Sequence, residues 1–162
     1  MHSELDKPLI RPVRVADLPA IIEIDRLNTG VAKSDYWRDV FERYGQSPRP
    51  RFFLVAEGNG AVLGFIIGEV RTWEFGSEPC GWVFAIGVRH EARLHHIGTH
   101  LLDALDERLK QSGISKVRTM MRRDNHLLMS FFRSQGMMAG PFLQLEKDID
   151  DDASGVSKRK RP

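Results

Sequence analysis

The chain has 162 residues, of which 41% are hydrophobic and 28% charged, and its formal net charge at pH 7 is +2. This size and balance predict one globular domain with a sizeable core. The small net charge argues against a nucleic-acid partner, and the lack of a long apolar run argues against a membrane span.

Two features of the sequence predict a cytoplasmic protein. The first six residues are polar and acidic, without the cationic start and apolar stretch of a signal peptide. Cys80 is the single cysteine, so the chain cannot form an internal disulfide, and we interpret it as a small buried residue. The basic residues 158–161 resemble a nucleic-acid patch, but a charged terminus of this kind more often only interacts with solvent.

The first half of the chain predicts a strand, two helices and a β-hairpin. Residues 9–15 alternate as a strand does, and Pro12 places that strand at a sheet edge. Asp17 and Ser34 are expected to cap the two helices. Strands over 52–56 and 61–71 flank the turn Gly58-Asn59-Gly60, and a loop over 72–79 follows. The apolar positions of the helices are Leu18, Ile21, Ile24 and Leu27 in the first, and Trp37, Val40, Phe41 and Tyr44 in the second.

The second half predicts a central strand, two more helices and two more strands. The apolar run 82–86 is typical of a strand covered on both faces, and Gly87 is expected to mark a bulge or a close approach of another group. A helix from Ile97 to about Gly113 follows, then a strand over 115–121, a helix over 124–136 and a strand over 138–145. The polar composition from Asp148 predicts a disordered tail.

This order predicts an α/β fold with a mixed sheet of six to seven strands and helices on both faces. Residues 1–147 form the expected single domain, and residues 148–162 form its tail.

The turn between the central strand and the next helix has the character of a phosphate cradle. It is basic, and it leads into a helix start, where amides lack intrahelical partners and the helix dipole adds positive charge. The alternative is a strand and a helix joined by a solvated basic loop. The basic residues are Arg89, His90, Arg93, His95 and His96.

Two local motifs, in order, carry a family resemblance. The first is Arg93-Leu94-His95-His96-Ile97-Gly98, followed by Thr99, and the second is Asn125, Phe132 and Gly136-Met137. With the order of elements over residues 9–147, they resemble the GCN5-related N-acetyltransferases, or GNAT family. The resemblance implies a bulged, splayed central strand, acetyl-CoA as cosubstrate, no metal, and an amine acceptor.

The resemblance also implies which residues hold acetyl-CoA. The central strand would bind the pantetheine arm, and the cradle would bind the pyrophosphate with its backbone amides. The expected binding residues are Ile86, Gly87 and Val88 on the strand, Arg93, Leu94, His95, His96, Ile97, Gly98 and Thr99 at the cradle, and Asn125 and Phe132 in the second motif.

The sequence departs from the family pattern at three positions. His96 stands where the family usually has glycine, so a side chain must turn away from the cradle. Phe132 replaces the tyrosine that protonates the departing thiolate in many members, and Tyr36 and Tyr44 are poor substitutes on sequence grounds. Trp82 occupies the position of the general-base glutamate of histone-type members.

Glu69 is then the first candidate for the base, because it interrupts an apolar strand, and Glu74 is the alternative. Glu78 and His126 are further candidates, and a solvent-facing glutamate is the competing interpretation of Glu69. The acceptor site is expected between the first two helices and the loop before the central strand. Its candidate residues are Asp35, Tyr36, Trp37, Trp73, Glu74 and Phe75, with core packing favoured for Trp37.

The sequence therefore predicts acetyl transfer from acetyl-CoA to a primary amine, on a small molecule or a peptide N-terminus, by direct attack. The alternative is an acyl-CoA-binding module with little or no catalysis, acting as a sensor or subunit. Either activity is compatible with a homodimer.

Overall fold

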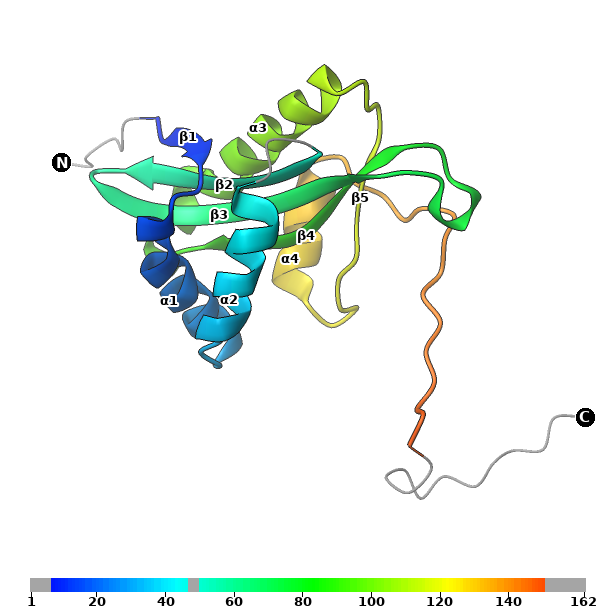
Figure 1. Ribbon diagram of the computed structural model, residues 1–162, viewed down its shortest axis with the longest axis horizontal. Coiled ribbons are helices and arrows are strands. Elements are labelled where there is room, and N and C mark those ends of the chain that lie inside the picture. Colours follow the sequence, from blue (N-terminus) through cyan, green and yellow to red (C-terminus); the bar gives the residue numbers. More distant parts are fainter. Residues whose placement is uncertain (1–6, 47–49, 151–162) are drawn as a thin grey trace, which may run out of the picture. The chain divides into compact units, whose positions relative to one another are not determined.

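The computed structural model describes residues 7–46 and 50–150 (Figure 1). The described residues up to Asn125 form one compact unit, and those from His126 form a second. The polar first six residues, residues 47–49 and the basic residues 158–161 lie outside the described ranges.

The first unit contains one five-stranded sheet in the order β1-β2-β3-β4-β5. Its strands are β1 (Leu9–Pro12), β2 (Arg51–Gly58), β3 (Ala61–Arg71), β4 (Cys80–Val88) and β5 (Val117–Thr119). The first four strands pair antiparallel, and β5 pairs parallel to β4. The mixed α/β fold is confirmed, and β1 is the edge strand that Pro12 predicts.

Helices cover both faces of this sheet (Figure 1). They are α1 (Leu18–Thr29), α2 (Ser34–Val40) and α3 (Ile97–Gln111), with short turns η1 (Val15–Asp17), η2 (Phe41–Gly45), η3 (Glu74–Gly76) and η4 (His90–His95) between elements. Because side chains alternate along a strand, Phe53 and Phe65 pack against α1 and α2. Gly64 and Gly68 face α3 instead, where an added Cβ would meet Ile97 or Leu105.

The core beneath α1 and α2 is built around Trp37. Its side chain is 2% exposed, and its ring centroid lies 5.0 Å from that of Phe65. The indole Nε1 donates to Asp25 Oδ2 at 3.0 Å, which satisfies the buried polar atom. Core packing of Trp37, the favoured interpretation, is confirmed.

Two expected helix caps are wrong. α1 begins after Asp17, but the Asp17 carboxylate accepts from the Arg14 amide at 2.7 Å and from Arg11, which precede it in the chain. α2 begins at Ser34 itself, after Lys33. In both cases the residue type marked the start of a helix. For Asp17, the bonds from Arg11 and Arg14 direct the carboxylate away from the helix amides.

The second unit contains α4 (His126–Ser134) followed by irregular chain. The expected strand over 138–145 is wrong, because the structure assigns no strand to these residues, and the sheet has five strands among the described residues rather than six to seven. Leu143 and Leu145 are 84% and 89% exposed. An alternating pattern makes a strand only where a partner pairs with it, and Pro141 also removes one backbone donor.

Candidate functional site

The central strand β4 bulges at Phe84 and opens on one side immediately afterwards. Ile67 of β3 pairs with Ala85 and Gly68 pairs with Val83, so Phe84 is the extra residue. On the other side, β5 pairs with β4 only from Gly81 to Val83. Thr119 Oγ1 donates to the Val83 carbonyl at 2.8 Å, at the point where pairing ends. Within the described residues, β4 from Phe84 to Val88 therefore has no strand partner on that side.

The position of this bulge corrects an expectation about Gly87. Gly87 was expected to mark either a bulge or a close approach of another group. It lies inside β4, paired with Phe65, and marks a close approach rather than the bulge. A Cβ at Gly87 would come within 2.6 Å of the Phe65 ring. The bulge falls three residues earlier, at a phenylalanine, so no glycine marks it in the sequence.

The cradle at the far end of β4 is narrower than the motif suggests. Residues 90–95 form the 3₁₀ helix η4, in which amides of the second half donate to carbonyls three residues back. The amides that an α-helix leaves without intrahelical partners include those of Ile97 and Gly98, in the first turn of α3. The helix dipole adds positive charge at this turn.

His96 joins η4 to α3 in a left-handed conformation, with φ 58° and ψ 28°. Glycine adopts this conformation at no steric cost, and histidine only at some cost. The His96 side chain is exposed. The left-handed backbone conformation at this position thus explains why the family pattern has glycine there.

Two arginines of the turn are held by neighbouring segments. Arg89 Nε donates to the Val62 carbonyl at 2.7 Å, and Arg93 Nη2 donates to Asn28 Oδ1 at 3.0 Å. Leu94, His95 and His96 are exposed. A further arginine, Arg122, pairs with Asp124 at 2.9 Å. Arg93 is therefore anchored to α1, while the basic residues His95 and His96, which directly precede α3 in the chain, are exposed.

Glu69 lies in the middle of a charged and aromatic cluster on the α2 side of the sheet. In register it pairs with Arg51 of β2 and Trp82 of β4. Its side chain is 15% exposed, and its two oxygens face different guanidiniums: Oε1 lies 3.0 Å from Arg71 Nε, and Oε2 lies 3.9 Å from Arg51 Nε. Glu69 is thus a largely buried, paired acid rather than a solvent-facing one.

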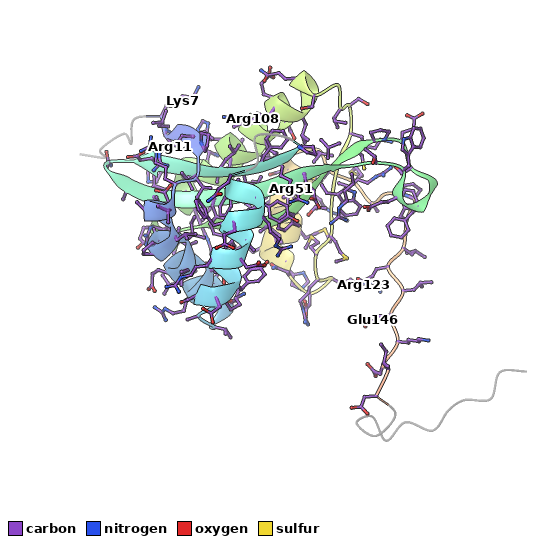
Figure 2. All side chains as sticks on the ribbon, in the orientation of Figure 1. Lys7, Arg11, Arg51, Arg108, Arg123 and Glu146 are labelled. Carbon is purple, nitrogen blue, oxygen red and sulfur yellow. The ribbon has the colours of Figure 1, made fainter. Side chains whose placement is uncertain are left out.

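Aromatic rings hold both of these guanidiniums. Arg71 Cζ lies 4.8 Å from the Trp82 ring centroid, and Arg51 Cζ lies 5.1 Å from that of Tyr44. Figure 2 shows Arg51 near the end of the segment formed by α2 and η2, where β2 begins. We call Tyr44, Arg51, Glu69, Arg71 and Trp82 the arginine–glutamate cluster.

Tyr44 connects this cluster to the bulge. Its ring centroid lies 4.7 Å from that of Phe84. Burial raises the pKa of Tyr44 above its usual value, and the Glu69 charge adds to the rise. A tyrosine with a raised pKa stays neutral at pH 7 and is a weak proton donor to a thiolate. Sequence reasoning missed its place beside the bulge, because only the fold brings η2 to β4.

The loop before β4 exposes its aromatic side chains. Trp73 and Phe75 are 68% and 81% exposed, and both have a positive φ. Glu74 Oε2 lies 3.9 Å from Arg71 Nη1, which connects the loop to the cluster, whereas Glu78 is exposed. Tyr36 is 45% exposed and packs edge-on against Trp37, and Asp35 is exposed in the first turn of α2. Cys80 is 4% exposed, as interpreted from the sequence.

The second motif spans the two units. Asn125 is the last residue of the first unit and is exposed. In the second unit, His126 opens α4, and Phe132 is 4% exposed with its ring centroid 5.3 Å from that of Phe131. The Met137 amide donates to the Phe132 carbonyl at 3.0 Å.

Among the residues that the structure describes, no group of three or more His, Cys, Asp or Glu side chains could hold a metal ion. In the same ranges, no helix has both the length and the apolar character needed to cross a membrane.

Comparisons with known proteins agree with this geometry. The model of the acetyltransferase (GNAT) family matches residues 18–137. A transcriptional regulator from Bacillus halodurans C-125 is similar in structure, with a TM-score of 0.74 and 14% identity over 87% of this chain and 99% of that one. Aminoglycoside 6'-N-acetyltransferase AAC(6')-Ih from Acinetobacter baumannii has a TM-score of 0.74 and 16% identity over 88% and 99%.

A third similar structure is aminoglycoside N-acetyltransferase AAC(6')-Iy in complex with CoA. It has a TM-score of 0.76 and 15% identity, over 88% of this chain and 95% of that one. At such identities these structures support the fold. The family match over most of the chain, with the opened central strand and the helix start that follows it, shows that this protein belongs to the GNAT acetyltransferase family.

Proposed function

We propose that this protein transfers an acetyl group from acetyl-CoA to a primary amine by direct attack of the amine on the thioester. The observation that carries the proposal is the opened edge of β4 between Phe84 and Val88, with the first turn of α3 at its far end. The family membership and the CoA complex of AAC(6')-Iy support the same donor.

The residues present fit this donor. Five residues of extended strand span about 17 Å, and alternate ones turn backbone N–H and C=O groups toward the open side, where an extended amide-containing arm can pair. Ile97 and Gly98 place amides at the positive end of α3, which suits a pyrophosphate. Bound acetyl-CoA would supply the activated thioester. The backbone at the Phe84 bulge would polarise the thioester carbonyl as an oxyanion hole does.

Glu69 is our first candidate for the base, and Glu74 the alternative. Glu69 lies beside Trp82 and close to the bulge, while Glu74 is 51% exposed and open to water. Either carboxylate could take the ammonium proton through a water chain. Phe132 has no proton to give, so we assign protonation of the departing thiolate to water or to the attacking amine nitrogen, which loses a proton as the amide bond forms and the C–S bond breaks.

The binding and the reaction are tested in two measurements. Saturating acetyl-CoA should raise the melting temperature, since about 2.7 kcal/mol of stabilisation is expected at 100 times the Kd. Free CoA thiol should then appear when amines are added. An unchanged melting temperature would overturn the donor assignment.

A negative charge placed in the cradle tests whether the acetyl-CoA-induced rise in melting temperature depends on binding there. Gly98→Asp should lower the acetyl-CoA-induced shift by repelling the pyrophosphate, while the ligand-free protein stays folded, because acids are favourable in the first turn of a helix. Gly140→Asp adds the same charge at an exposed glycine with open space around it, and should leave the shift unchanged.

An acyl-CoA-binding module without turnover is the second candidate. It is favoured by Phe132 and by the arginines that already occupy both oxygens of Glu69. Stabilisation by acetyl-CoA without thiol release from amines of several classes would support this candidate instead.

A further inference from the structure

The arginine–glutamate cluster has more hydrogen-bond donors than acceptors. A guanidinium has five N–H donors, and the cluster holds two guanidiniums beside one buried carboxylate. Arg51 gives one donor to the Arg43 carbonyl at 3.1 Å, and Arg71 gives its Nε to Glu69. Among the described residues, most of their N–H groups thus have no acceptor and remain for another one.

The nearby carboxylates are not available to a second ammonium. Both oxygens of Glu69 face guanidiniums, Glu74 faces Arg71, and Asp39 pairs with Arg43 at 2.7 Å. Asp39, Glu69 and Glu74 therefore each have an arginine partner. A cationic group would have to displace an arginine, whereas an anionic group would add hydrogen bonds.

The two guanidiniums are accessible and held in place. The side chains of Arg51 and Arg71 are 44% and 32% exposed. Arg51 and Arg71 lie over the rings of Tyr44 and Trp82, and Glu69 lies 3.0 Å from Arg71 Nε and 3.9 Å from Arg51 Nε. An arginine held in this way loses little side-chain entropy when it binds a carboxylate.

The cluster also lies within reach of the opened strand. Neighbouring strands are about 5 Å apart, so Arg51 on β2 is about 10 Å from β4 across the sheet. Arg71 stacks on Trp82, which precedes the bulge at Phe84 by two residues. A short molecule with its amine at the bulge can therefore place its other end against these arginines.

We propose that the acceptor is an amine that also carries a carboxylate, and that Arg51 and Arg71 bind this carboxylate while Glu69 positions both arginines. The inference rests on the proposed acetyl transfer and specifies its acceptor class. Simple alkylamines lack the group that the cluster recognises, and diamines carry the opposite charge.

The test compares three matched acceptors: γ-aminobutyrate, butylamine and putrescine. In a thiol-release assay with acetyl-CoA, kcat/KM should be about tenfold higher for γ-aminobutyrate than for the other two, since one charge-assisted pair contributes about that factor. Arg71→Met keeps an apolar stem over Trp82 and removes the charge. It should abolish this preference, because kcat/KM falls much more for γ-aminobutyrate than for butylamine.

Arg43→Met is the matched control. Arg43 Cζ lies 5.6 Å from the same Tyr44 ring, but this arginine pairs with Asp39 rather than Glu69. Arg43→Met should keep the preference. If Arg71→Met fails to fold because Glu69 loses its closest partner, Arg51→Met removes the second guanidinium at its longer distance of 3.9 Å.

A binding measurement separates this inference from the proposed function. A rise in melting temperature with γ-aminobutyrate that is lost in Arg71→Met would support the carboxylate site. If acetyl-CoA gives no rise in the same measurement, acetyl transfer is overturned, but the carboxylate site is not. Thiol release at equal rates for the three acceptors, or an equal loss for all three in Arg71→Met, would overturn the inference and leave the acetyl transfer intact.

Discussion

His96 has a backbone conformation that its side chain does not favour. With φ at 58° it lies in the left-handed region, which costs an L-residue roughly 1–2 kcal/mol relative to glycine. The sequence identified His96 only as a departure from a family glycine. The structure adds the physical reason, which is the reversal of the chain between η4 and α3.

We therefore expect His96→Gly to raise the free energy of unfolding by about 0.5–1 kcal/mol, part of the relief being offset by glycine's larger backbone entropy. Urea denaturation measures this change. Alanine is strained at a positive φ as histidine is, so His96→Ala should not raise the free energy of unfolding. Equal effects of the two substitutions would show that strain at His96 is absent.

Asp106 on α3 is a second residue that lowers the stability of the folded protein. Its Oδ1 is buried and, within the described part of the chain, has no hydrogen-bond partner. Burial raises the pKa of Asp106, and the like charge of Asp103 adds to the rise. A raised carboxyl pKa means that the folded state binds the proton more tightly, so the cost grows as pH rises through the folded-state pKa.

Asp106→Ala should consequently stabilise the protein at pH 7, by about 1 kcal/mol as expected for removing a partly buried unsatisfied group. The gain should shrink as pH falls toward the unfolded-state pKa near 4, because the raised pKa lets the folded state take up the proton first. Thermal unfolding at both pH values tests this. Asp103→Ala removes only the lesser cause of the raised pKa and should give a smaller gain, and a pH-independent gain from Asp106→Ala would contradict the explanation.

At the scale of elements, one ionic network joins β1, η1 and β2. Arg11 of β1 pairs with Asp17 at 2.8 Å and with Glu57 of β2 at 2.7 Å. The side chains of Arg11 and Asp17 are 12% and 7% exposed. The hydrogen bonds from Arg11 lower the pKa of Asp17 below its usual range. This network holds the short edge strand at the start of α1.

Because the pKa of Asp17 is lowered on folding, its contribution is complete above the unfolded-state pKa near 4 and is lost as pH falls through the folded-state value. Asp17→Asn should lower stability at pH 7 by about 2 kcal/mol. The difference from wild type should fade below about pH 4 in denaturant titrations. Glu23→Gln, which breaks the exposed pair with Arg26, should have a much smaller effect.

Some turns and helix ends are correctly predicted from local sequence signals alone. The turn at Asn59-Gly60 was predicted, and both residues have the positive φ that such a hairpin turn requires. Gly30, Gly113 and Gly136 likewise have positive φ where helix ends were expected. The second helix was predicted as one continuous segment to Tyr44, but α2 ends at Val40 and continues as the π-helix η2. That change depends on packing against β2 and β4, which periodicity does not contain.

At the scale of the whole molecule, the C-terminal tail is expected to be dispensable. Residues 148–162 contain four acids and four bases and few apolar side chains. Deleting residues 151–162 should change the free energy of unfolding by less than about 0.5 kcal/mol, as for other surface changes, and should leave the acetyl-CoA-induced shift intact. Loss of that shift on deletion would show that the tail takes part in binding.

The sequence by itself determined the family, the order of elements as far as α4, and the turn and helix start proposed to bind the donor. These signals are local, because motif spacing, helical periodicity and glycine positions act within a few residues. Only the tertiary structure decided where the central strand bulges, at Phe84, where β4 and β5 part, after Val83, and that Arg51, Glu69 and Arg71 cluster beside Tyr44 and Trp82. Each of these depends on strand register and packing between segments distant in the chain, which no single stretch of sequence specifies.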